Sequence, residues 1–300
     1  MLRRLRNDHS MTLSADRKYD LHCHSTASDG ELTPAELVRY AASQGVNVLA
    51  LTDHDVTDGL AEAATEAEKV GIEFITGVEI SVTWQKHLIH IVGLNFDPAN
   101  ETLQQGLAGL RQMRQGRGEE MALRLAKAGV ENALAGAQAY SNGKILSRTH
   151  FAQFLYKSGR VKSLQGAFDR FLGTGKPAYV SCEWCTLEEA VGWITAAGGV
   201  AVIAHPARYK LSATKLRALI EAFMAAGGQG FEVVSGSQGL HENSNMADYA
   251  RRYGLLASVG SDYHGPSQAW LGMGRVGPLP RGCIPVWQRW SSPADTEVLQ

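Results

Sequence analysis

Apolar runs of strand length alternate with helix-length segments through most of this chain. Capping boxes at 33–36 and 186–189 mark the starts of two of the helices. The alternation is typical of parallel strands joined by helices, which either close into a barrel or form an open sheet. Seven runs read as strands, at about 19–24, 46–51, 72–80, 88–94, 199–204, 231–234 and 255–259. Six of them end in or carry polar residues that a barrel would gather at one mouth, so we expect a barrel.

The alternation stops between residues 101 and 180, where helical periodicity continues without a confident strand. This segment holds 12 Lys and Arg against 5 Asp and Glu, in a chain with 29 against 30 overall. We therefore expect a basic helical insertion at 101–180 that acts as a substrate cap, and an α/β barrel built from 19–100 and 181–300. A solvated helical surface would explain the charge equally well. Residues 1–18 are expected to form a disordered or frayed tail.

Composition adds few constraints. The 300 residues are 44% hydrophobic and 20% charged, with a net charge of −1, as in ordinary globular proteins. No apolar run is long enough for a membrane helix, and the basic N-terminus lacks the apolar region of a secretory signal. We expect a cytoplasmic protein with no membrane contact and no obligate protein partner. Four scattered cysteines exclude a disulfide framework, and a zinc or redox role for Cys182 and Cys185 stays open.

Six of the ten histidines lie at or near the ends of predicted strands, together with five carboxylates. They are His22, His24, His54, His90, His205 and His264, with Asp20, Asp29, Asp53, Glu79 and Asp262. One histidine on a strand is usually structural, but so many ionisable groups at one barrel mouth need partners. Metal ions are the simplest partners, and mixed nitrogen and oxygen ligands suit Mn, Fe or Zn better than Mg or Ca. The pattern predicts a site with several metal ions.

These motifs resemble those of the PHP (polymerase and histidinol phosphatase) superfamily over residues 19–270. In chain order they are Asp20-x-His22-x-His24, Thr52-Asp53-His54, Gly77-Val78-Glu79, His90, Ala204-His205-Pro206 and Ser261-Asp262-Tyr263-His264. The resemblance implies a distorted seven-stranded barrel with three divalent metal ions that hydrolyses phosphoesters. It assigns one metal to His22, His24, Glu79 and Asp262, a second to Glu79, His90 and His205, and a third to Asp29, His54 and His264. Asp20 and Asp53 would orient histidines.

The resemblance also implies a reaction without a protein nucleophile. Metal ions would lower the pKa of a bound water and deliver hydroxide to phosphorus. We expect manganese, with iron or zinc as alternatives.

The insertion, its segment 145–152 and residues 205–209 resemble the subgroup of 3′,5′-nucleoside bisphosphate phosphatases, some of which act as 5′-to-3′ exoribonucleases. Arg148, His150 and Arg208 would then clamp the phosphate of a small nucleotide or short oligonucleotide. Tyr209 or Trp184 is a candidate for stacking on a base, although core packing is the favoured role for either residue taken singly.

Three other functions fit parts of the sequence. They are another PHP phosphatase, for example one acting on histidinol phosphate, a metal-binding regulatory module without turnover, and an amidohydrolase acting on C–N bonds. The complete set of candidate ligands favours an enzyme over a regulatory module. The basic insertion favours a highly charged phosphoester over the other substrates.

Overall fold

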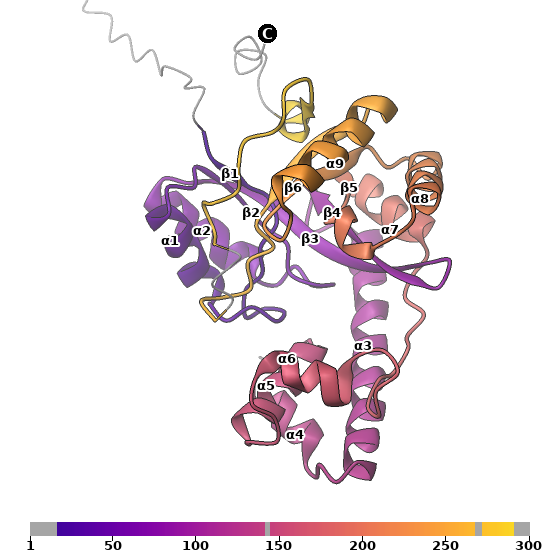
Figure 1. Ribbon diagram of the computed structural model, residues 1–300. Coiled ribbons are helices and arrows are strands. Elements are labelled where there is room, and N and C mark those ends of the chain that lie inside the picture. The colour runs from indigo at the N-terminus through magenta and orange to yellow at the C-terminus, as the bar shows by residue number, and fades with distance from the viewer. Residues whose placement is uncertain (1–16, 142–144, 268–271, 291–300) are drawn as a thin grey trace, which may run out of the picture.

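The computed structural model describes residues 17–141, 145–267 and 272–290, and their strands form one curled sheet in chain order (Figure 1). The strands are β1 (Tyr19–Asp20), β2 (Val48–Leu51), β3 (Glu73–Trp84), β4 (His87–Leu94), β5 (Val200–Ile203), β6 (Gly230–Ser235), β7 (Leu256–Gly260) and β8 (Ile284–Pro285). This arrangement confirms the predicted α/β barrel class, and each predicted strand is present. The short strand β8 is an eighth that the sequence did not indicate.

The sheet closes where the segment after β1 meets β7. The amide of Leu21 donates to the carbonyl of Val259 at 3.0 Å, and Cys23 forms a parallel bridge with Tyr263. The strand predicted at 19–24 is shorter than expected, because the amide of Cys23 donates to the Thr52 hydroxyl instead of a strand carbonyl. Side-chain hydrogen bonding thus replaces the regular ladder at this seam.

Strand β4 runs antiparallel to both of its neighbours, whereas the other strand pairs are parallel. Gln85 and Lys86 connect β3 to β4 with positive φ angles of 45° and 67°. Such a two-residue turn can join only antiparallel strands, so the expectation of uniformly parallel strands is wrong at β4. The reversal puts His90, which lies within β4 opposite Ser81, at the same mouth as the ends of the parallel strands.

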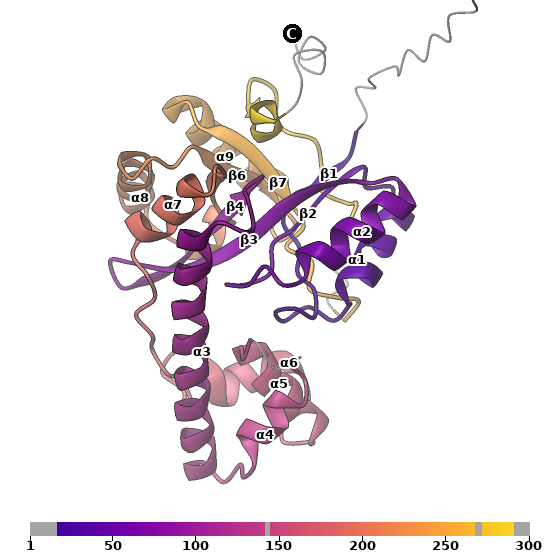
Figure 2. The same ribbon diagram turned by 180° about the vertical axis from the view of Figure 1, so that it is seen from behind.

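Helices cover the outside of the barrel (Figures 1 and 2). They are α1 (Pro34–Ser43) and α2 (Leu60–Val70) near β1–β3, α7 (Leu187–Ala196) and α8 (Ala213–Ala225) near β4 and β5, and α9 (Leu240–Tyr253) beside β6. Both predicted capping boxes form, one at Thr33 and the other at Thr186. Two 3₁₀ turns, η2 (Pro206–Tyr209) and η3 (Val286–Arg289), complete the barrel.

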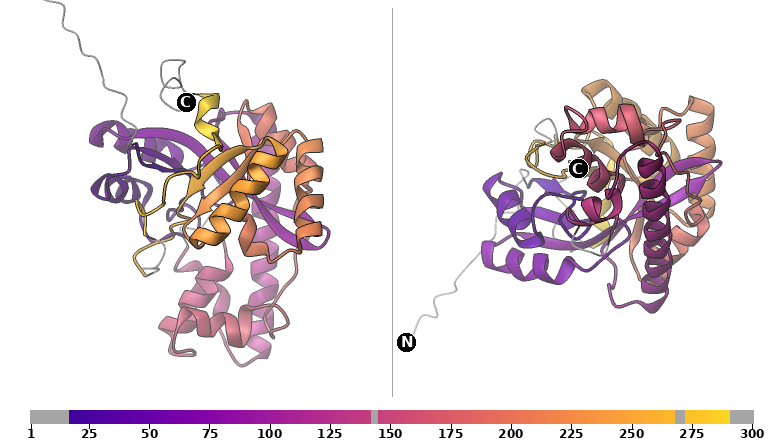
Figure 3. Two further views of the ribbon diagram at one scale, coloured as in Figure 1. Left: turned by 45° about the horizontal axis from the view of Figure 1, so that its top comes forward. Right: turned by 90° about the horizontal axis from the view of Figure 1, so that it is seen from below.

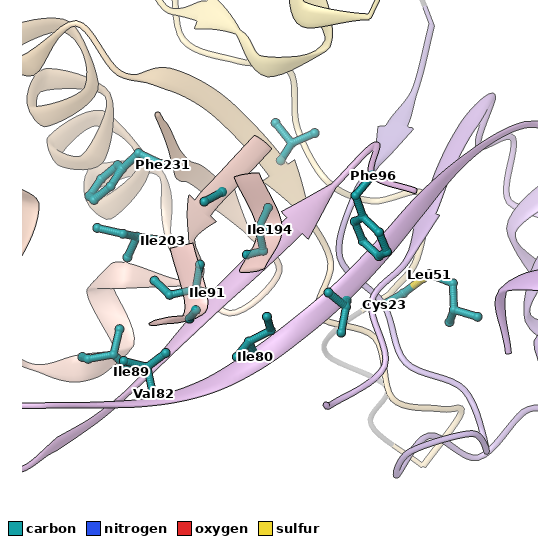
Figure 4. Packing of buried hydrophobic residues seen from close by; sticks show 14 of the residues in the cluster. Cys23, Leu51, Ile80, Val82, Ile89, Ile91, Phe96, Ile194, Ile203 and Phe231 are labelled. Atoms are coloured by element: carbon teal, nitrogen blue, oxygen red, sulfur yellow. The ribbon is translucent and has the colours of Figure 1, made fainter. Parts of the chain in front are cut away.

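Apolar side chains pack on both faces of the sheet. Leu49 and Leu51 belong to the outer core between the sheet and the helices, while Val48 and Ala50 belong to a cluster with Val202 on the other face. Alternate residues of one strand thus serve two cores, which explains the unbroken apolar runs in the sequence. Figure 4 shows the outer core around the β3–β4 hairpin, with Ile80, Val82, Ile89, Ile91, Ile194, Ile203 and Phe231 among its members.

The described residues between 101 and 180 form helices and loops. The helices are α3 (Glu101–Lys127), α4 (Ala133–Gln138), α5 (Arg148–Lys157), α6 (Leu164–Ala167) and the π-helix η1 (Phe168–Leu172). They enclose a separate apolar cluster that includes Met121, Leu125, Phe151 and Phe171. The right-hand view of Figure 3 shows these helices lying in front of the barrel.

Among the described helices, none has both the length and the apolar character needed to cross a bilayer. The expected tail at 1–18 lies almost wholly outside the described residues, which begin at residue 17.

Glycines in α3 provide a matched test of its packing. Gly109 has open space where a Cβ would lie, so Gly109→Ala should stabilise the fold by about 1 kcal/mol through helix propensity. A Cβ at Gly106 would lie 2.4 Å from Trp193 of α7, so Gly106→Ala should lower the midpoint of thermal unfolding. Thermal denaturation of both variants measures this, and equal shifts would contradict the described contact between α3 and α7.

Candidate metal centre and substrate pocket

Histidines and carboxylates converge at one mouth of the barrel in three groups. Within each group, one ligand atom per residue lies within 4.8 Å of the others. The groups are His22, His24, Glu79 and Asp262; His54, Glu79 and His90; and His24, Asp29, His54 and His264. His205 joins them, because its Nε2 lies 3.0 Å from Glu79 Oε1. The structure thus brings together all nine residues that were predicted as metal ligands.

The carboxylate of Glu79 lies at the middle of this assembly and has no solvent exposure. It has five close histidine neighbours: His22, His90 and His205 at 3.3, 2.9 and 3.0 Å from Oε1, and His24 and His54 at 3.3 and 2.9 Å from Oε2. Burial alone would raise the pKa of Glu79, but the surrounding histidines hold it well below its ordinary value. The carboxylate is therefore ionised, with both oxygens shared among imidazoles.

Many buried polar atoms of these groups have no hydrogen-bond partner among the described residues. They include His22 Nε2, both ring nitrogens of His24, Asp29 Oδ1, His54 Nδ1 and Glu79 Oε2. Leaving one such atom unpaired costs about 1–3 kcal/mol. Imidazole nitrogens and carboxylate oxygens are ligands for divalent transition metals, and here they point toward one another. The residues present therefore fit a metal centre.

The protonation states of His24 and His90 agree with this fit. Burial, assisted by the neighbouring His264, lowers the pKa of His24 to about 3, and burial lowers the pKa of His90 to about 4. Both rings are neutral at pH 7 and can donate a lone pair. Against the effect of burial, the Asp29 carboxylate raises the pKa of His264 to about 9. A metal ion bound there has to displace a proton.

Glu232 of β6 contacts two of the predicted metal ligands, and its role was not predicted from the sequence. Its carboxylate accepts the backbone N–H of His205, and Oε1 lies 3.2 Å from Nδ1 of His22. His205 has a φ of 29°, a strained value for a residue with a side chain, so the bond to its N–H helps to fix it. The available signal was a single acid inside the apolar run 231–234.

Asp20 and Asp53 accept hydrogen bonds from backbone amides and serine hydroxyls, and their expected role in orienting histidines stays a prediction. Asp20 accepts the amide of Ser261 at 2.8 Å, while Asp53 accepts the Ser25 amide and the hydroxyls of Ser25 and Ser28. Burial raises the pKa of each to about 6. Their hydrogen bonds fix the backbone next to Asp262 and the turn that leads to Asp29.

A cavity of about 340 Å³ joins the metal ligands to the insertion. The insertion contributes Arg114, Arg117, Ser147, Arg148, Thr149 and Phe168 to its lining, and Trp184 and Leu88 close another part of the wall. The barrel side of the cavity therefore has carboxylates, imidazoles and the guanidinium group of Arg208, whereas the insertion side has three guanidinium groups.

The three residues predicted to clamp phosphate occupy different environments. Arg148 lines the cavity, with its guanidinium carbon 5.9 Å from the Phe168 ring centroid. Arg208 also lines it and donates to Asp262 Oδ2. His150 is not among the lining residues. It is buried, and its Nδ1 accepts the amide of Ser147 in the cap of α5, so the structure gives it a capping contact.

Arg114 and Arg117 were not singled out from the sequence. Arg114 is buried, donates to Asp55 Oδ2 at 2.6 Å and to the Ser81 hydroxyl at 2.8 Å, and lies 5.0 Å from the Trp184 ring. The guanidinium carbon of Arg117 lies 5.6 Å from the centroid of the same Trp184 ring, and Arg117 donates to the carbonyl of Val180. Spacing of three along α3 was the available signal, because it puts both on one helical face.

The segment that carries most of these residues matches a known protein family. The model of the family described as "PHP domain" matches residues 20–233. A 3′,5′-nucleoside bisphosphate phosphatase of Chromobacterium violaceum is 49% identical over 90% of this chain and 95% of its own length. A 5′-3′ exoribonuclease of Haemophilus influenzae is 46% identical over 91% of this chain and 99% of its own.

A solved structure gives the same result for the fold. It is that of an amidohydrolase from Chromobacterium violaceum with bound sulfate and no metal, at a TM-score of 0.87 and 48% identity. The match covers 91% of this chain and 95% of that one. The chain described here belongs to the PHP domain family.

Proposed function

We propose that this protein is a divalent-metal-dependent phosphohydrolase that removes a phosphate from a 3′,5′-nucleoside bisphosphate. The observation that carries the proposal is one cavity in which three groups of His and carboxylate residues face three arginines of the insertion. Metal ligands suit the scissile phosphate, and the arginines suit a further anionic group of the same small molecule. The insertion then serves as the substrate cap.

The residues present would hold three divalent ions, with Glu79 shared between two of the groups. The mixed nitrogen and oxygen ligands favour manganese, with iron or zinc as alternatives. When bound, such ions supply an activated water and neutralise phosphate oxygens. The protein's own part is to keep His24 and His90 neutral and to hold the Glu79 carboxylate ionised among them.

The arginines form a site that requires an anion. Burial, and then the neighbouring Arg148 and Arg114, lower the pKa of Arg117 to about 10, so Arg117 remains charged at pH 7. Arg114 is paired with Asp55, whereas Arg117 and Arg148 repel each other in the partly buried cavity, and a phosphate between them relieves this repulsion. Trp184 lies beside two of the arginines and holds them in place through cation–π contacts.

The hydroxyl groups of the cavity are already engaged in hydrogen bonds, which supports a reaction without a protein nucleophile. Ser81 accepts from Arg114, Ser147 accepts the amide of Thr149, Thr149 donates to Asp29, and the Tyr209 hydroxyl accepts the amide of His90. Only Thr149 contacts a carboxylate among these hydrogen bonds, and that carboxylate belongs to Asp29, a predicted metal ligand.

Trimming of short RNA from its 5′ end is a second candidate activity. One relative is named as a 5′-3′ exoribonuclease, and the described part of the insertion carries exposed cations that could follow an RNA backbone. These cations are Lys157, Arg160, Lys162, Arg170 and Lys176.

The class and the substrate are tested together by phosphate release. Manganese-loaded protein is compared on adenosine 3′,5′-bisphosphate, AMP, histidinol phosphate and a short 5′-phosphorylated RNA. We expect rapid release from the bisphosphate and slow release from AMP and histidinol phosphate. Mononucleotides from the RNA would support the second activity. No turnover of any of the four by protein with confirmed metal content would contradict the proposal and favour C–N bond hydrolysis.

Replacing Arg148 tests the phosphate clamp. Arg148→Ala should lower kcat/KM for the bisphosphate by roughly 10- to 100-fold, the usual loss for a charge-assisted hydrogen bond, while metal content stays unchanged. Arg160→Ala, an exposed arginine of the same insertion, is the matched control and should leave kcat/KM nearly unchanged. Loss of metal from the Arg148 variant would refute its assignment.

Replacing Glu79 tests the shared ligand. Glu79→Gln removes the charge that balances five histidines and should reduce bound manganese by at least one equivalent, measured by elemental analysis after dialysis. Glu73→Gln changes an exposed acid of the same strand and should retain the full metal content. Equal metal content in the two variants would show that Glu79 is not a ligand.

A further inference from the structure

The insertion contacts the barrel at the loop that carries one of the candidate metal ligands. Ile145, just before α5, is fully buried in a small cluster with Ala27 and Val56. Ala27 lies two residues before Asp29 in the sequence, and Val56 lies two residues after His54. The cluster is separate from the main cores of the barrel and the insertion. The segment that begins at Ile145 is therefore a docking point between the two parts of the molecule.

A direct hydrogen bond connects α5 to Asp29 at this docking point. The hydroxyl of Thr149 donates to Asp29 Oδ2 at 3.0 Å, and Asp29 is only 5% exposed. The other oxygen, Oδ1, has no hydrogen-bond partner among the described residues and lies 3.4 Å from Nε2 of His264 and 4.0 Å from Nε2 of His54. One oxygen of Asp29 thus contacts the insertion, and the other faces the candidate metal cluster.

The first turn of α5 holds Thr149 firmly in this position. The Ser147 hydroxyl accepts the amide of Thr149 at 3.1 Å, and Ser147 N donates to the ring of His150 at 3.2 Å. Arg148, between Ser147 and Thr149, lines the cavity beside Phe168. A single helical turn therefore contacts both the predicted substrate site and the loop of Asp29.

We propose that Thr149 is a positioning residue for the metal cluster of His24, Asp29, His54 and His264, so that docking of the insertion sets the metal affinity of that cluster. The inference rests on the proposed metal centre. An outer hydrogen bond fixes the orientation of a ligating carboxylate, and its loss typically weakens metal binding by about 10- to 100-fold. The donor here comes from the insertion, whereas the cluster itself is built by the barrel.

Docking in this way links the metal cluster to the substrate site. An anion held by Arg148 and a metal ion held by Asp29 both favour the same placement of the first turn of α5. Each should therefore increase the affinity for the other, because coupling between two sites is reciprocal.

The test is a manganese titration of the metal-free protein, followed through the electron paramagnetic resonance signal of free Mn²⁺. Thr149→Val keeps the side-chain shape and removes the hydroxyl, and it should weaken one manganese equivalent by about 10-fold or more. Thr149→Ser restores a hydroxyl and should bind manganese as the unmodified protein does. A second readout is KM for the bisphosphate at saturating manganese, which should rise in Thr149→Val and stay unchanged in Thr149→Ser, because the hydroxyl carries the coupling between the two sites; an equal rise in both variants would indicate general loosening of the insertion.

The variant Asp29→Asn distinguishes the proposed role of Thr149 from the proposed role of Asp29 as a metal ligand. Loss of one manganese equivalent in Asp29→Asn, together with an unchanged isotherm in Thr149→Val, would overturn the role of Thr149 and leave the metal centre intact. Full manganese binding by Asp29→Asn would overturn the ligand assignment itself and the role of Thr149 with it. Weakened binding in Thr149→Ser equal to that in Thr149→Val would also contradict the proposal.

Discussion

The buried carboxylate of Glu79 is the constraint on which the rest of the structure depends. A fully buried charge is tolerated only when opposite charges or metal ions surround it. Strand β3 pairs with β2 through residues 73–76 and with β4 from Gly77 onward, so Glu79 lies just past the point where the strand changes partner. The parallel bridge between His54 and Glu79 brings in the segment after β2, and the reversed β4 brings in His90. Barrel closure supplies the segment of His22 and His24 from the other side.

Polar contacts join the barrel to the insertion at two loops that carry predicted metal ligands. Asp55, the neighbour of His54, holds Arg114 of α3 in a buried ion pair, and Asp29 accepts the hydroxyl of Thr149 of α5. Such buried pairs add little stability, since desolvation offsets their attraction, but they fix the relative position of the groups they join. Arg114 is therefore placed by the loop that carries His54, and the first turn of α5, which includes Arg148, is docked against the loop that carries Asp29.

The strand runs and the motifs at their ends were sufficient to predict the barrel class and the nine residues that converge at its mouth. The direction of β4 was also accessible, because too few residues separate it from β3 for a crossover helix. Glu232, Arg114 and Asp55 were not predicted, because their roles arise from contacts between segments distant in sequence. His150 was predicted to contact phosphate from the resemblance of segment 145–152 to the bisphosphate phosphatases, whereas the structure turns its ring toward the cap at Ser147.

We propose that metal ions on the barrel and arginines from the insertion bind the two phosphates of one nucleotide. Anomalous diffraction from crystals grown with manganese and a nonhydrolysable 3′,5′-bisphosphate analogue would locate both phosphates and the ions. We expect three manganese peaks among the nine predicted ligands, one phosphate on those peaks, and the other beside Arg114, Arg117 and Arg148. Manganese elsewhere, or an analogue that leaves the arginines unoccupied, would contradict this proposal.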